Sequence, residues 1–157
     1  MPCASTSSSN GHHNLWKLIW HIPAPPKIKM FLWRLSNNAI ATSLNLFNRK
    51  CAQSPVCQIC FQERESTEHM LFRCSWTIPV WFACPLSLRP PSLDNYASVQ
   101  SALMSKISLA SKKIALGFLA TFALTSWAIW KAKNANIFED IPINPALTHK
   151  FKSSFFL

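Results

Sequence analysis

The sequence predicts a mainly α-helical protein. Apolar residues make up 49% of its 157 residues, which is enough for one domain with a core, and along several stretches they recur at helical spacing. The chain contains two glycines, too few for the many tight turns of a β-sandwich or barrel and for a glycine-rich phosphate loop. A compact group of cysteines with one histidine is the third observation. We therefore expect a small helical domain with a Cys3His knuckle, followed by one or two longer helices.

The first residues carry little structural signal. Residues 1–13 are small, polar and without period, and we expect them to form a disordered tail. They lack the apolar segment of a signal peptide. We therefore expect an intracellular protein, in the nucleus or the cytoplasm.

The first part of residues 14–88 is predicted to form three helices. The first helix is indicated by apolar residues at helical spacing, namely Trp16, Ile19 and Trp20. The second helix should start at Pro26, which suits the first turn of a helix. Its core-facing stripe at i, i+3, i+4 and i+7 consists of Ile28, Phe31, Leu32 and Leu35. Thr42 is predicted to cap a third, short helix.

Residues 57–74 read CQICFQERESTEHMLFRC, a C-x2-C-x8-H-x4-C arrangement. Three thiols and one imidazole make a complete tetrahedral ligand set for zinc. We predict a structural Zn2+ site and a zinc-binding domain over residues 14–88, with the ligands Cys57, Cys60, His69 and Cys74. Cys51 could compete with Cys57, but the C-x2-C spacing favours Cys57 with Cys60. His69 and Cys74 can meet only if the helix between them ends or loosens near Arg73.

Other roles for these cysteines must be weighed. They could be reduced, buried thiols, or the C-x2-C pair could be a redox motif, which normally needs a βαβ context. A catalytic zinc would keep an open position for water, whereas four protein ligands close the site. The closed ligand set favours a structural metal.

The second half of the chain is expected to be helical. Residues 89–98 (RPPSLDNYAS) are predicted to be a linker, 99–140 one or two long helices with a break near 108–111, and 141–157 a loosely ordered tail. Residues 114–130 are uncharged, at the lower limit of a membrane-spanning length. We expect a buried helix there, with a membrane-associated protein as the alternative.

The charge distribution favours a phosphate-bearing partner. The formal net charge is +10, and no Asp or Glu precedes Glu63. A basic surface without acids binds phosphates through counterion release. The candidate nucleic-acid contacts are Lys27, Lys29, Arg34, Arg49 and Lys50. Six acids in all are too few for a two-metal nuclease or polymerase, so we expect no enzyme activity from this chain by itself.

Several motifs, taken in order, resemble a known family. They are Trp16 with Trp20, Pro26-Lys27-Ile28-Lys29, Phe31-Leu32-Trp33-Arg34, Cys57-x-x-Cys60, Glu65-Ser66-x-Glu68-His69, Leu71-Phe72-x-Cys74 and Val80-Trp81. The segment Trp127-Ala-Ile-Trp130-Lys-Ala-Lys-Asn134 with Phe138 resembles a W-x-I-W-K/R-x-R-N motif, although Lys133 stands where arginine is expected. The family is the zinc-binding domain of reverse transcriptases from plant non-LTR (LINE-type) retrotransposons.

The resemblance implies a position and a set of partners. In full-length elements the domain lies between a reverse transcriptase and a ribonuclease H. This chain has the catalytic carboxylates of neither enzyme, so it looks like a fragment of a larger retroelement polyprotein. The implied partners are RNA or DNA, contacted at phosphates, and a reverse transcriptase or ribonuclease H module. A protein-interaction module is the alternative role.

Overall fold

The structure is a computed structural model that describes residues 9–85 and 96–150. These residues are mostly helical and contain no strand; an isolated antiparallel bridge joins Val56 to Arg64. The helices are α1 (Ser9–His21), α2 (Pro26–Ser36), α3 (Ser43–Asn48), η1 (His69–Arg73), α4 (Thr77–Phe82), α5 (Val99–Ile107), α6 (Lys112–Glu139) and α7 (Pro145–Lys150). The predicted fold class is confirmed, including the break between two C-terminal helices.

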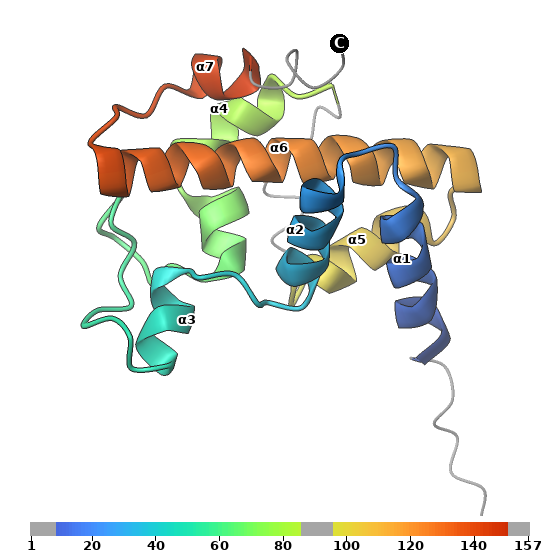
Figure 1. Cartoon of the computed structure of the whole chain (residues 1–157), viewed down its shortest axis with the longest axis horizontal. Coiled ribbons are helices and arrows are strands. Elements are labelled where there is room, and N and C mark those ends of the chain that lie inside the picture. The colour runs from blue at the N-terminus through green and yellow to red at the C-terminus, as the bar shows by residue number, and fades with distance from the viewer. Residues whose placement is uncertain (1–8, 86–95, 151–157) are drawn as a thin grey trace, which may run out of the picture.

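Helix α6 is the axis of the fold. Its 28 residues extend about 42 Å, and Figure 1 shows the other helices arranged along both sides of it. Ser111 caps its N-terminus by accepting a hydrogen bond from the Ile114 amide, and Asp140 ends it with a φ of 53°. Its buried side chains, such as Leu119, Phe122 and Ile129, join residues from α1, α2, α4 and α5 in one core. One core therefore includes both halves of the sequence.

Among the described residues, α6 is also the helix long and apolar enough to cross a membrane, by length and composition alone. Of its most apolar window, 56% is buried inside the protein. The apolar character of residues 114–130 is thus largely used in packing against neighbouring helices.

The predicted start signals of the N-terminal helices are confirmed. Pro26 occupies the first turn of α2, and all four residues of the predicted stripe on this helix are buried. Thr42 Oγ1 accepts a hydrogen bond from the Asn45 amide, 3.2 Å away, and so caps α3. In α1 the predicted stripe is wrong at Trp20, which is 45% exposed, whereas Leu15, Leu18 and Ile19 are buried. This face turns inward because it lies against α2, α5 and α6.

Three predicted segment boundaries differ from the structure or lie partly outside the described residues. Helix α1 begins at Ser9, so residues 9–13 are helical and not part of a disordered tail; no proline lies there to prevent the extension. Residues 1–8 and most of the predicted linker 89–98 lie outside the described residues. Within the predicted loose tail 141–157, residues 145–150 form α7, which packs on α4 and α6. The packing of α7 depends on helices that are distant in sequence, so the proline-rich local sequence does not predict it.

Candidate metal centre

The four predicted zinc ligands lie together in the structure. Their ligand atoms all lie within 4.8 Å of one another. The Sγ atoms of Cys57 and Cys74 are 4.0 Å apart, and Cys60 Sγ is 3.4 Å from His69 Nε2. A tetrahedral zinc with ordinary bond lengths would place two sulfurs about 3.8 Å apart and a sulfur and a nitrogen about 3.6 Å apart. The cluster therefore fits this metal with little adjustment.

The knuckle that carries Cys57 and Cys60 is shaped by backbone hydrogen bonds. The Cys57 amide donates to Glu63 O at 2.8 Å, and the Phe61 amide donates to Cys57 O at 3.0 Å. Phe61 adopts a left-handed conformation, with a φ of 56°, which turns the chain back. The tight turn points both sulfurs to the same side.

A π-helical turn brings His69 to Cys74. Ser66 Oγ accepts from the His69 amide at 3.0 Å, which starts the turn, and the Cys74 amide donates to His69 O at 2.9 Å. This i to i+5 bond is the π-helical pattern, which places residues five apart near each other. In a regular α-helix they would point in different directions. The expectation that the helix loosens near Arg73 is met by η1.

The cluster already favours deprotonated sulfur at Cys57. A hydrogen bond from Cys74 is the largest cause that lowers the pKa of Cys57 to about 3, outweighing burial, and a bond from His69 helps. The same hydrogen bond, with burial, raises the pKa of Cys74. Burial opposes the charged form of His69, but the hydrogen bond to Cys57 and the charges of Cys57 and Cys60 raise its pKa to about 9. Protons on Cys74 and His69 thus supply the positive charge that zinc supplies when it binds.

A carboxylate orients the histidine. Glu63 Oε2 lies 3.2 Å from His69 Nδ1, while Nε2 faces the sulfurs. In protein zinc sites a carboxylate on the far nitrogen fixes the ring and raises its basicity. Glu63 is 59% exposed, so water screens this interaction.

Glu65 connects the zinc segment to the helical core. This side chain is 0% exposed and forms an ion pair with Lys133 of α6, which is 3% exposed. Its other oxygen accepts from the amide of Ser43 at 3.0 Å and from the hydroxyl of Ser43. Lys133 Nζ also lies 4.9 Å above the ring of Trp130. The pair thus ties the loop before η1 to both α3 and α6.

Glu68 makes a further connection. Its Oε1 accepts from the Val99 amide at 3.3 Å, at the N-terminus of α5, where Ser98 is the cap. Glu65, Glu68 and Lys133 were part of the motifs read from the sequence, but none of these contacts was predicted. The signal in the sequence was their place in the motifs that resemble the family, and the partners Glu65 and Lys133 are too distant in sequence for the pair to be predicted.

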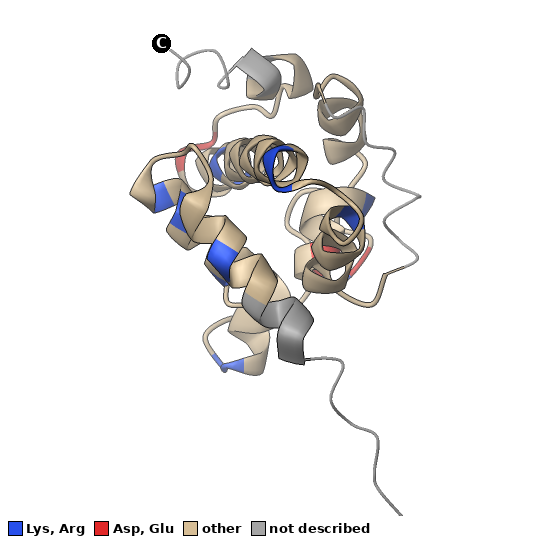
Figure 2. Ribbon diagram, turned by 90° about the vertical axis from the view of Figure 1, so that its right-hand side faces the viewer, with Lys and Arg blue, Asp and Glu red and all other residues tan. Residues whose placement is uncertain are grey.

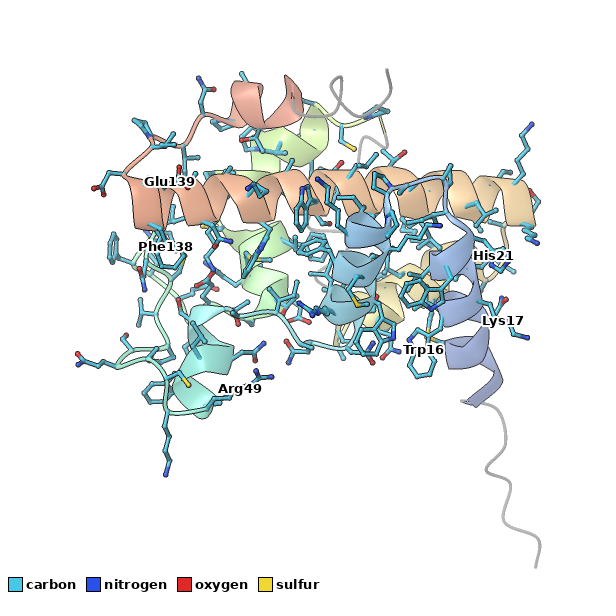
Figure 3. The ribbon with its side chains drawn as sticks, in the orientation of Figure 1. Trp16, Lys17, His21, Arg49, Phe138 and Glu139 are labelled. Carbon is cyan, nitrogen blue, oxygen red and sulfur yellow. The ribbon has the colours of Figure 1, made fainter. Side chains whose placement is uncertain are left out.

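Cys51 and the candidate nucleic-acid contacts lie elsewhere. The exposed Cys51 is not part of the cluster, and its thiol lies 3.5 Å from Arg49 O. Arg49 and Lys50 follow the end of α3, where Figure 3 shows Arg49. The other three candidates, Lys27, Lys29 and Arg34, are on α2, and Lys29 Nζ donates to Trp20 O at 2.9 Å. In Figure 2 the basic residues are spread over several helices, so the five candidates form more than one group.

The fold and these four converging side chains define a helical zinc-binding protein. A sequence model of the family described as zinc-binding in reverse transcriptase matches residues 4–81. Residues 4–81 therefore belong to this family, and the resemblance stated from the motifs is confirmed. The domain is zinc-binding, and its Cys3His group is positioned to hold the ion.

A relative extends the similarity beyond that region. A protein of Arabidopsis thaliana named "Putative ribonuclease H protein" is 26% identical over 125 residues, which are 80% of this chain and 20% of the relative. The chain thus spans about a fifth of the relative's length. The aligned stretch is longer than residues 4–81, so the similarity includes residues outside the matched zinc-binding region. No solved structure matches the chain significantly.

Proposed function

We propose that this chain is a non-catalytic zinc module that holds nucleic acid beside a retroelement enzyme, with Cys57, Cys60, His69 and Cys74 as the ligands of one structural zinc. The convergence of these four ligand atoms to within 4.8 Å of one another supports the metal assignment most strongly. All four positions are protein ligands, which leaves no open position for a reacting water. The zinc then stabilises the fold.

Segregation of charge supports the nucleic-acid role. The acids of the zinc segment interact within the protein: Glu63 with His69, Glu65 with Lys133 and Ser43, and Glu68 with the α5 N-terminus. Helices α1 to α3 contain no acid. The candidate contacts, Lys27, Lys29 and Arg34 on α2 and Arg49 and Lys50 directly after α3, come from a part of the sequence that contains no acid. They carry positive charge, for which phosphate is the complementary group.

The zinc assignment is tested by metal analysis of protein purified without added metal. We expect about one zinc per chain, as for a Cys3His site, and nearly none in His69→Ala. Cys51→Ser is the matched control because Cys51 lies outside the cluster. Equal zinc in His69→Ala and the unaltered protein would refute the ligand assignment.

The nucleic-acid role is tested by gel-shift titration at several salt concentrations. If all five basic residues contact duplex phosphates, the slope of log K against log salt approaches about −4.5. The variant Lys27→Gln, Arg34→Gln, Arg49→Gln should have a slope smaller by about 2.7. The control with the same charge change is Lys106→Gln, Lys113→Gln, Lys131→Gln. Absence of binding, or binding insensitive to salt, would refute the proposal and favour the reverse transcriptase or ribonuclease H module as the partner.

A further inference from the structure

Helices α2 and α6 are in direct contact (Figure 1). Side chains of these two helices line a groove. Its volume is about 360 Å³, in the lower part of the range of about 300–1,000 Å³ for small-molecule sites. Its lining combines two cations with apolar and aromatic side chains, chiefly Lys27, Met30, Phe31, Arg34, Trp127 and Trp130. Among the described residues, no acidic side chain lines it.

Aromatic rings from both helices line the groove. Phe31 of α2 meets Trp127 edge-on, with centroids 5.1 Å apart, and Trp130 at 6.3 Å. Both tryptophans are half-buried, so part of each remains accessible. Trp130 is also held by Lys133, which is itself paired with the buried Glu65. The rings are therefore fixed in place by the core and by the zinc segment.

The two cations of the groove lie at separate positions along α2. Lys27 and Arg34 are seven residues apart on α2, which is two turns, or about 10 Å along the helix. Both side chains are exposed. They can therefore contact phosphates on either side of one nucleotide whose base enters the groove.

We propose that this groove binds single-stranded nucleic acid, with an unpaired base against Trp127 and Trp130 and the flanking phosphates at Lys27 and Arg34. The inference rests on the proposed nucleic-acid role. It adds that the bound nucleic acid is single-stranded and that it binds in this groove. Stacking on aromatic rings between basic groups is how sequence-tolerant single-strand sites work. Bases in a duplex are already stacked and cannot enter. An acidic peptide would satisfy the cations but offers no flat ring to the tryptophans.

The experiment removes the base from the nucleic acid and leaves the protein unchanged, because removing Trp127 would also disturb its packing on Phe31. The full chain is titrated at one salt concentration with an oligothymidylate of about 12 nucleotides. Parallel titrations use an abasic strand of the same length, a duplex of that length and poly-glutamate. We expect the single strand to bind about tenfold more tightly than the abasic strand.

A pair of variants locates the site. Lys27→Gln with Arg34→Gln should lose about tenfold in affinity for the single strand, with unchanged helical content. Lys106→Gln with Lys131→Gln carries the same charge change outside the groove and should lose less than about threefold.

The outcomes separate the inference from the proposed function. Equal affinity for the single strand, abasic strand and duplex would overturn the assignment of the groove as a single-strand site and leave the nucleic-acid role intact. Equal losses of affinity in the two variants would do the same. Selective loss of poly-glutamate binding in the groove variant would also overturn it, in favour of a peptide site. Absence of binding to every nucleic acid would overturn both.

Discussion

The zinc segment and the core around α6 are stabilised in different ways. Between Cys57 and His69, side chains such as Gln58, Phe61 and Arg64 are exposed, and the buried ones are mostly polar. The segment is held by its cysteine–histidine cluster and by carboxylates that bind other elements. Around α6, Leu119, Phe122 and many apolar neighbours are buried against each other. Removing the metal should therefore affect the first region far more than the second.

The largest effect is expected from removing a ligand. Cys74→Ser should reduce zinc from about one ion per chain to nearly none, and should unfold residues 57–74, because zinc supplies on the order of 10 kcal/mol in small zinc-dependent folds. Metal analysis and hydrogen exchange resolved by segment would measure both effects. The comparison of the two regions would fail if amides of α6 lost protection as completely as those of η1.

The next largest effect should come from the connection between the regions. Glu65→Ala leaves Lys133 buried without its partner, and we expect a loss of about 3–5 kcal/mol in the free energy of unfolding. Denaturant unfolding of zinc-saturated protein would show it. Glu139→Ala, at the exposed end of α6, is the control.

A double-mutant cycle then isolates the pair. Glu65→Ala combined with Lys133→Ala should cost less than the sum of the two single changes, because no unpaired charge is left. Strict additivity would mean that the two side chains do not couple the zinc segment to α6.

A cavity in the core should lower stability without releasing zinc. Leu119 is 0% exposed, and Leu119→Ala should cost about 2–5 kcal/mol, depending on how far the site collapses. Zinc content should remain at about one per chain. A zinc content reduced in parallel with stability would show that the regions fold as one inseparable unit.

The smallest expected effect is a gain in stability. Gly117 lies inside α6, and a Cβ atom there would meet no atom within 4 Å. Gly117→Ala should raise the free energy of unfolding by about 0.5–1 kcal/mol, because alanine favours the helix. Thermal unfolding would detect it, and zinc affinity should not change. A lower melting temperature would show that the helix needs the glycine for another reason.

Local sequence determined a large part of this protein. Periodicity selected the buried stripe of α2, because a helix repeats every 3.6 residues and Ile28 and Leu35 must then share a face. The preference of threonine for helix N-caps predicted the start of α3 at Thr42, and the preference of zinc for thiolate and imidazole ligands predicted the Cys3His group. Each of these depends on residues close in sequence or on the coordination preference of zinc.

Tertiary structure decided what depends on distant partners. Glu65 and Lys133 lie 68 positions apart in the sequence, and only folding makes them an ion pair. The π-helical turn that brings His69 to Cys74 has no propensity signal of its own and persists because both residues belong to one cluster. Helix α7 depends on its contacts with α4 and α6. The sequence alone identified the four candidate metal ligands, whereas the tertiary structure determined how their cluster is attached to the core.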